Sequence, residues 1–117
     1  MEVQIFGTKG CADTRKALRF FSERRIKAHF VDLKERAASQ GELKRFAQKF
    51  GVDALVDRTS RRFQARGLER ASYGEARWLQ ILEEEPLMLR TPLVRSGKNV
   101  ALGVDEAAWT RWIDPGE

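Results

Sequence analysis

Cys11 is the residue of this chain whose type and setting are best suited to chemistry. It follows a short apolar segment, residues 3–6, which reads as a strand, and it precedes a helix expected from about Asp13. The free amides and the positive end of the helix dipole at such a position stabilise a thiolate and lower the pKa of a cysteine. A reactive thiol is therefore the favoured interpretation, and a small residue buried in the core is the alternative.

The residues next to Cys11 support the same chemistry. Lys9 and Arg15 add positive potential, whereas Asp13 opposes it. Thr14 stands three residues after the cysteine, close enough along a helix for its hydroxyl to reach the sulfur. We therefore predict that Cys11 is a catalytic nucleophile and that Thr14 and Arg15 stabilise its thiolate.

The sequence also limits the chemistry that is open to this thiol. It contains one cysteine and one histidine, His29, so an internal disulfide and a zinc site of the ordinary kind are both excluded. Any oxidised form of Cys11 must be resolved by a thiol from another molecule. We expect His29, which lies in a predicted strand, to be structural, and we expect no metal.

The first third of the chain predicts a β-α-β unit. Strands are expected at residues 3–6 and 28–33, and a helix at about 13–24 lies between them. The apolar positions of that helix, Ala17, Leu18 and Phe21, fall on one face. A crossover of this length is what a parallel pair of strands requires.

The middle of the chain is expected to be helical. Ser39 and Glu42 form a capping box for one helix, which Gly51 ends. Ser72 and Glu75 are interpreted as a second capping box. The helix that follows it is expected to bury Ala76, Leu79 and Leu82 and to end before Pro86, and an arginine-rich loop at 57–67 precedes it.

The last third returns to strands. Residues 87–94 and 100–102 are expected to form a hairpin around the turn at 96–99, and Asp105 is expected to cap a final helix that carries Trp109 and Trp112. The order predicts an α/β protein with a thioredoxin-like fold (βαβ-ββα) and a helical insertion between its halves. We expect a single domain, residues 1–117, with the insert at about 40–85.

Composition restricts the partners and the compartment. The chain has 117 residues and a formal net charge of +5, and it has no apolar run long enough to span a bilayer. We expect a protein of a reducing compartment, the cytoplasm, with no membrane partner. Basic residues gather at 15–27 and 58–70. Solvated helix faces beside an anion-binding cleft are the favoured interpretation, and a footprint for nucleic acid or an acidic protein is the alternative.

Three segments together resemble one known family. Residues 10–17 (GCADTRKA), 50–58 (FGVDALVDR) and 89–94 (LRTPLV) are similar to the glutaredoxin-coupled arsenate reductases and their relatives, which include the Spx-type transcription regulators. The resemblance implies a thioredoxin-like fold and a nucleophilic cysteine after the first strand. It also implies that the Thr91–Pro92 step is the cis-proline that packs beside that cysteine.

The resemblance further implies a reaction. In the arsenate reductases the thiolate attacks arsenic, arginines hold the oxyanion, glutathione attacks the adduct, and glutaredoxin clears the mixed disulfide. Carried onto this chain, Cys11 is the nucleophile, and Arg58, Arg90, Thr91 and Pro92 are the candidates for binding an oxyanion or glutathione. Glutathione is then a co-substrate and glutaredoxin a possible partner. The substrate is a small oxyanion or a thiol compound, and no bound cofactor is implied.

The chain departs from the arsenate-reductase pattern at its arginines. Thr91 stands directly before the proline, and Arg90 is one place earlier, which reverses the side-chain face along a strand. Asp57 occupies another arginine position, and residues 100–103 supply no arginine. These differences favour a glutathione-dependent thiol reductase of the small arsenate-reductase-like branch.

The alternative belongs to a different class, an Spx-like regulator that binds RNA polymerase without a redox switch. Gly51 matches a glycine that such regulators use for the polymerase contact. Thr14 replaces the second cysteine of their Cys-x-x-Cys switch.

Overall fold

The structure, a computed structural model, describes residues 1–114. Its contacts divide the chain into two compact units. Unit 1 combines residues 1–32 with the chain from residue 91 onward, and unit 2 consists of residues 33–90. Unit 1 carries the predicted nucleophile, Cys11.

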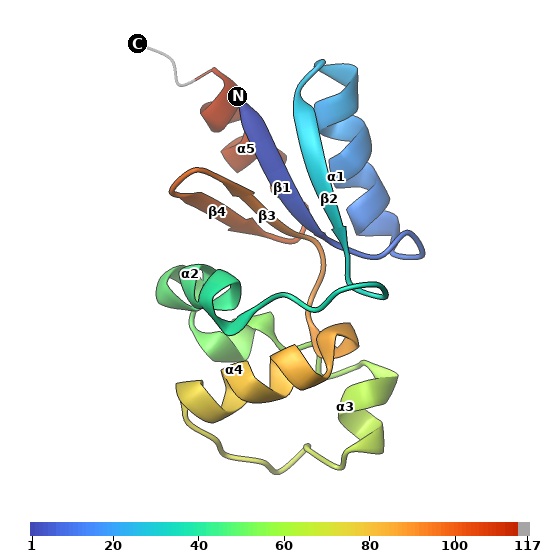
Figure 1. Cartoon of the computed structure of the whole chain (residues 1–117), viewed down its shortest axis with the longest axis vertical. Helices are drawn as coiled ribbons and strands as arrows, with labels where there is room; N and C mark the ends of the chain where they lie inside the picture. Colours follow the sequence, from blue (N-terminus) through green and yellow to red (C-terminus); the bar gives the residue numbers. More distant parts are fainter. Residues whose placement is uncertain (115–117) are drawn as a thin grey trace. The chain divides into compact units, whose positions relative to one another are not determined.

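Unit 1 is built on a four-stranded sheet (Figure 1). Its strands are β1 (Glu2–Gly7), β2 (Lys27–Asp32), β3 (Leu93–Ser96) and β4 (Asn99–Leu102), and their order is β2-β1-β3-β4. β1 pairs in parallel with β2 and antiparallel with β3, which in turn pairs antiparallel with β4. The parallel pair and the terminal hairpin are the two halves predicted from the sequence.

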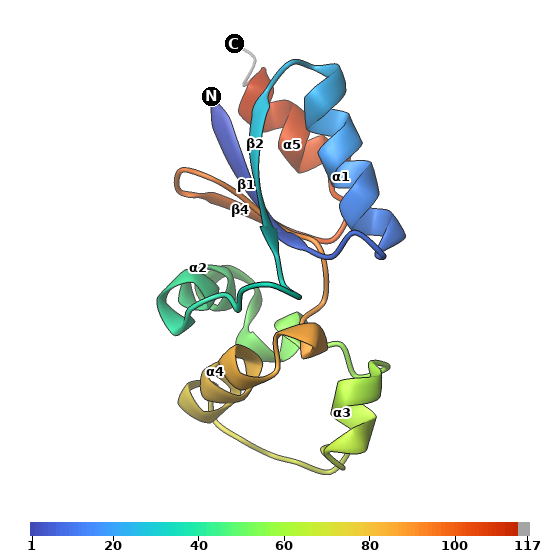
Figure 2. The same ribbon diagram turned by 45° about the vertical axis from the view of Figure 1, so that its right-hand side comes forward.

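Two helices cover one face of this sheet. α1 (Ala12–Glu23) crosses from β1 to β2, and α5 (Glu106–Ile113) follows β4. Figure 2 shows the two helices side by side. The ring of Trp109 on α5 lies 5.1 Å from that of Phe20 and 5.4 Å from that of Phe21, both on α1, and Val3 and Ile5 of the sheet complete this core. The predicted α/β, thioredoxin-like order βαβ-ββα is thus confirmed.

Two local predictions in unit 1 are also confirmed. The side chain of Asp105 accepts a hydrogen bond from the Ala108 amide at 3.1 Å and caps α5. Gly97, in the turn between β3 and β4, has a φ of +60°, a conformation that glycine adopts without steric cost.

Unit 2 consists of helices and turns. Its elements are α2 (Gln40–Phe50), the 3₁₀ turn η1 (Val52–Leu55), α3 (Arg61–Ala65), α4 (Glu75–Glu84) and the 3₁₀ turn η2 (Pro86–Met88). The predicted capping box is present, because the Ser39 hydroxyl accepts from the Glu42 amide and the Glu42 carboxylate accepts from the Ser39 amide. Gly51 ends α2 with a φ of +82°.

The second predicted capping box is wrong. α4 begins one residue after Gly74, and no side chain caps it. Its position is set by its buried residues, Trp78, Leu79, Ile81 and Leu82, and Ala76 is exposed. Burial of a tryptophan and three aliphatic side chains outweighs one capping hydrogen bond of about 1 kcal/mol.

Two further segments differ from expectation. The arginine-rich loop contains the short helix α3, whose first turn is capped by the Ser60 hydroxyl accepting from the Phe63 amide. The strand expected from residue 87 begins only at Leu93, because Pro86 opens η2 and Leu89 forms a single bridge with Val56.

Residues 1–114 contain neither a membrane-spanning helix nor a cluster of metal-ligating side chains. Within residues 1–114, no helix has the length and apolar character needed to cross a membrane. In the same part of the chain, no three acidic, histidine or cysteine side chains gather as metal ligands.

Candidate active site

Cys11 occupies the N-cap position of α1. Its amide donates to the Thr8 carbonyl at 3.1 Å, which closes the turn after β1, and its carbonyl accepts the first helical hydrogen bond from Arg15 at 3.1 Å. Its backbone is extended, with φ −83° and ψ 119°. This conformation places the side chain of an N-cap residue beside the unpaired amides of the first turn. The thiol is half-buried, so it is accessible to a reactant.

Thr91 approaches the same sulfur from the other half of unit 1. Its hydroxyl donates to the Cys11 sulfur at 3.1 Å, and the thiol lies 3.9 Å from the Thr91 carbonyl oxygen. The Thr91–Pro92 peptide bond is cis, as the resemblance implied. The resemblance placed the Thr91–Pro92 step beside Cys11, but Thr91 was assigned to oxyanion or glutathione binding, and the bond from its hydroxyl to the sulfur was missed.

Thr14 lies beneath the thiol in a space left by a glycine. It is fully buried, and its hydroxyl makes no fully formed hydrogen bond within the described part of the chain. A methyl group on Gly7, at the end of β1, would lie 2.6 Å from the Thr14 Cγ2 atom and closer still to its hydroxyl oxygen. Gly7 therefore provides the room that this threonine occupies. Gly7 was not singled out from the sequence.

These contacts favour the thiolate. Partial burial opposes ionisation of Cys11, but hydrogen bonds from the Thr14 and Thr91 hydroxyls and from the backbone amides of Thr14 and Asp13 outweigh it. The net result is a pKa of Cys11 below its usual value. Of the two hydroxyls, that of Thr91 bonds the sulfur with full hydrogen-bond geometry. The Thr14 hydroxyl has no other hydrogen-bond partner among the described residues.

The predicted basic residues have other partners in the structure. The Arg15 guanidinium donates to the Lys9 carbonyl at 2.7 Å and so fastens the turn before Cys11. Its role toward the thiolate stays a prediction.

The two oxyanion candidates belong to unit 2. Arg58 lies 3.6 Å from the Asp53 carboxylate and over the rings of Phe63 and Trp78. The Arg90 guanidinium donates to the Ala54 carbonyl at 3.3 Å. Binding of a substrate by these arginines stays a prediction.

His29 is placed away from this chemistry. It is an exposed residue of β2 that pairs with Glu2 of β1, and their interaction lowers the pKa of the Glu2 carboxyl. Its contact joins the two parallel strands, which agrees with the structural role expected from the sequence.

A protein-family model identifies the family to which the chain belongs. The ArsC family matches residues 6–112, which includes Cys11, the helix that it caps and the Thr91–Pro92 step. The chain belongs to the ArsC family. One relative is an uncharacterized 15.7 kDa protein in the draG 3′ region of Rhodospirillum rubrum, 26% identical over 123 residues. That alignment covers 99% of this chain and 85% of the relative.

Solved structures show the same fold. An arsenate reductase from Vibrio cholerae has a TM-score of 0.77 at 21% identity, covering 87% of this chain and 89% of that protein. The solution structure of an arsenate reductase (ArsC) related protein from Brucella melitensis has a TM-score of 0.66 at 22% identity, covering 97% and 96%. At these identities the likeness concerns the fold, and the substrate has to be argued from the site.

Proposed function

We propose that this protein is an arsenate-reductase-like thiol oxidoreductase that uses Cys11 as its nucleophile and glutathione as the resolving thiol. The observation that carries the proposal is the setting of the Cys11 sulfur. It lies at the N-cap of α1, accepts the Thr91 hydroxyl at 3.1 Å, and has a lowered pKa. A thiolate held by donors and left accessible is the active form of a cysteine nucleophile.

The proposed reaction consists of two exchanges. The Cys11 thiolate attacks the glutathione sulfur of a mixed disulfide, R–S–S–G, forming a Cys11–glutathione disulfide and releasing RS⁻, which takes up a proton. The thiolate of a second glutathione then attacks the sulfur of the glutathione bound to Cys11, releasing oxidised glutathione and restoring the Cys11 thiolate. The sum is RSSG + GSH → RSH + GSSG, in which R is reduced and glutathione is oxidised.

A mixed disulfide suits this site better than arsenate does. A thiolate that attacks an arsenate anion accumulates charge, which needs several aligned cationic donors. Arg58 already faces Asp53, and the guanidinium of Arg90 already donates to the Ala54 carbonyl. Attack on a neutral disulfide sulfur adds no charge to the complex, and its leaving thiolate needs only a nearby donor.

The proposal is tested by the formation of a glutathione adduct on Cys11 and by its removal with reduced glutathione. We expect the purified protein, after incubation with oxidised glutathione, to gain one glutathione mass on Cys11, and we expect reduced glutathione to remove it. Cys11→Ser should gain none. In a coupled assay with glutathione and glutathione reductase, the protein should reduce a glutathione mixed disulfide of a small thiol. An unreactive Cys11 would overturn the proposal.

The regulator alternative gains no specific support from the described residues. Gly51 is accounted for by its φ of +82°, and a methyl group built there meets nothing within 4 Å. Glycine is therefore required by the backbone at the end of α2. Binding of RNA polymerase by a chain with an unreactive Cys11 is the result that would favour the regulator.

A further inference from the structure

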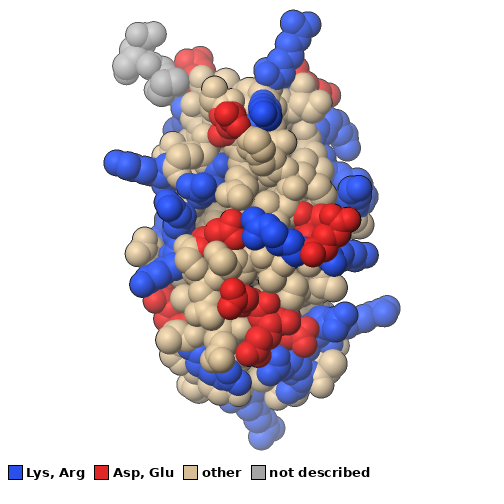
Figure 3. Space-filling model, viewed as in Figure 1, with Lys and Arg blue, Asp and Glu red and all other residues tan. Residues whose placement is uncertain are grey.

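One short segment of unit 1 carries a concentration of positive charge. Between residues 15 and 27 the only acidic residue is Glu23, and the segment has six cationic residues: Arg15, Lys16, Arg19, Arg24, Arg25 and Lys27. The net charge of this segment is thus +5, equal to that of the whole chain. All six are exposed. Figure 3 shows both signs of charge interspersed over the face that it displays.

Stability of α1 does not account for Arg15, Lys16 and Arg19, whereas Arg24 at its end donates to the Phe20 carbonyl at 2.9 Å and lies over the Phe20 ring. A helix is stabilised by acidic side chains near its N-terminus and basic ones near its C-terminus. α1 has one acid in its first turn, Asp13, and no basic residue in its last turn. Arg15, Lys16 and Arg19 lie instead in its N-terminal two-thirds, where they oppose the dipole.

The backbone conformation of Arg25 is energetically unfavourable for a residue with a side chain. The Arg25 amide donates to the Ser22 carbonyl and the Ile26 amide to the Phe21 carbonyl, both at 3.0 Å, which is the Schellman pattern of a helix end. Arg25 occupies the left-handed position of this motif, with a φ of +58°, where glycine is the usual residue. An arginine there is strained, although its charge suits a helix C-terminus.

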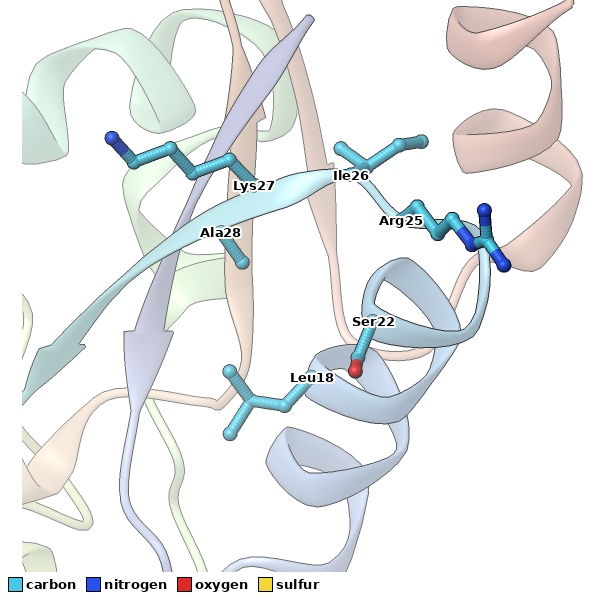
Figure 4. A pocket seen from close by; sticks show the side chains of 6 residues that line it. All are labelled: Leu18, Ser22, Arg25, Ile26, Lys27 and Ala28. Atoms are coloured by element: carbon cyan, nitrogen blue, oxygen red, sulfur yellow. The ribbon is translucent and has the colours of Figure 1, made fainter.

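Arg25 stands at one end of a groove between α1 and β2. The groove has a volume of about 530 Å³, and the apolar residues that line it are Leu18, Ile26 and Ala28. These three are partly buried and pack against the core of unit 1. Figure 4 shows Leu18 and Ser22 projecting from α1 and Ala28 projecting from β2 toward the helix, with Arg25 in the loop beyond the end of α1 and with Ile26 and Lys27 on the other side of the strand ribbon. β2 is an edge strand of the sheet, so its outer backbone groups are open to an extended chain.

This combination selects a protein segment over a nucleic acid. Binding to single-stranded nucleic acid relies on exposed aromatic rings on which bases stack. The aromatic residues of α1, Phe20 and Phe21, are buried at 5% and 0% exposure. A groove lined by apolar residues beside cations suits an extended peptide that has aliphatic and acidic side chains.

We propose that the α1–β2 groove and the two cations that line it (Arg25 and Lys27) dock an acidic, extended segment of the protein whose oxidised sulfur Cys11 attacks. This proposal rests on the proposed function, and it names the class of substrate as a glutathione mixed disulfide on an acidic protein. From Cys11 to Ser22 the helix rises about 16 Å, a distance that about five extended residues span. A segment docked in the groove therefore reaches the thiol with a cysteine about five residues away.

Binding is tested without any redox step. The protein is the full chain with Cys11→Ser, and the probe is a fluorescein-labelled peptide of about twelve residues, rich in glutamate with two leucines and one serine in place of cysteine. We expect saturable binding, measured by anisotropy, that Arg25→Glu/Lys27→Glu weakens at least about tenfold at low salt and that about 1 M salt largely removes. Lys98→Glu, in the exposed hairpin turn, makes the same kind of charge reversal and should leave binding nearly unchanged. A basic peptide of equal length should not bind.

Arg25→Gly separates docking from folding. Glycine relieves the left-handed strain, so we expect an unchanged or raised Tm together with several-fold weaker peptide binding. Binding that survives both variants, or an equal affinity for a single-stranded oligonucleotide, would overturn the docking proposal. If Cys11 reacts with oxidised glutathione but does not prefer an acidic peptide disulfide to a neutral one, docking alone is wrong. If the acidic peptide binds while Cys11 is unreactive, the proposed reaction alone is wrong.

Discussion

At the scale of single residues, the chemistry depends on two threonines that meet one sulfur from different parts of the chain. Thr14 belongs to the helix that Cys11 caps, and Thr91 precedes the cis-proline before β3. Both hydroxyls lower the pKa of Cys11, against the effect of partial burial. The sequence predicted Thr14 because three residues of helix separate it from Cys11. It could not predict the bond from Thr91, which depends on how β3 pairs with β1.

The first prediction concerns these two hydroxyls. Thr91→Val removes the donor that lies 3.1 Å from the sulfur, and Thr14→Val removes the buried one. Each should raise the pKa of Cys11, because the thiolate loses a hydrogen bond that the thiol needs less. The measurement is the rate of iodoacetamide alkylation against pH. Thr91→Ser, which keeps the hydroxyl, is the control, and an unchanged titration in both valine variants would contradict the assignment.

The second prediction concerns Gly7. Gly7→Ala places a methyl group 2.6 Å from the Thr14 Cγ2 atom, so β1 or α1 must move. We expect a loss of about 1–3 kcal/mol in the free energy of unfolding, as for other overpacked sites. Because Thr14 is displaced, the pKa of Cys11 should rise as well. Both are measured on the same protein, by urea unfolding and by alkylation.

The double variant Gly7→Ala/Thr14→Ala serves as the test of cause. Removal of the threonine side chain should restore much of the lost stability, and the thiol pKa should equal that of Thr14→Ala alone. If Gly7→Ala leaves both quantities unchanged, Gly7 does not shape the site.

At the scale of elements, the sequence predicted those features that depend mainly on residues close together in the chain. The β-α-β unit, the Ser39–Glu42 capping box, the Asp105 cap and the hairpin turn follow from periodicity, side-chain caps and turn residues, and the structure confirms all four. The start of α4 was wrong because the burial of Trp78 and its neighbours fixes the helix, and burial is a property of the tertiary structure. The helix α3 was missed because a five-residue helix has too few positions to show a period.

The third prediction concerns the capping box of α2. The Arg36 guanidinium bonds the Glu42 carboxylate at 3.0 and 3.1 Å and, together with the Ser39 amide, holds the pKa of that carboxyl at about 2 instead of 4.5. A carboxyl with a lowered pKa stabilises the folded state above its unfolded pKa, and this contribution is lost as pH falls through the folded value. Stability should therefore decline as pH falls from about 4.5 toward 2.

The measurement is the midpoint of urea unfolding across that range of pH. Glu42→Gln keeps a capping side chain but has no charge to lose, so its midpoint should fall less steeply than that of the unmodified protein. Ser39→Ala should cost about 1 kcal/mol at neutral pH, as other N-caps do. Parallel pH profiles for Glu42→Gln and the unmodified chain would contradict the role of the Arg36 pair.

At the scale of the whole molecule, the chemistry is divided between the two units. Unit 1 holds the complete thiol setting: the helix start, both threonines and the cis-proline. Unit 2 holds the arginines that the resemblance assigns to an oxyanion, and each of them has a partner inside that unit. The described contacts of the Cys11 sulfur thus all come from unit 1, whereas Arg58 and Arg90 each use part of their donor capacity inside unit 2. This division favours substrates whose reaction requires a thiolate and does not require several arginines around an oxyanion.

The last prediction is the choice between arsenate and a glutathione mixed disulfide. Each missing oxyanion donor costs an enzyme about 10²–10³ in rate, so arsenate reduction in an assay with glutathione and glutaredoxin should be at least about a hundredfold slower than by an enzyme with all of its oxyanion donors. We expect it to be slower than reduction of the mixed disulfide by this chain. Thr91→Arg puts a cation directly before the proline and removes the hydroxyl that donates to the sulfur. It should therefore bind arsenate more tightly, measured as protection of Cys11 from alkylation, and react more slowly with oxidised glutathione. Rapid, Cys11-dependent arsenate turnover by the unmodified chain would show that its oxyanion donors are sufficient, and it would reverse the order of the two substrates.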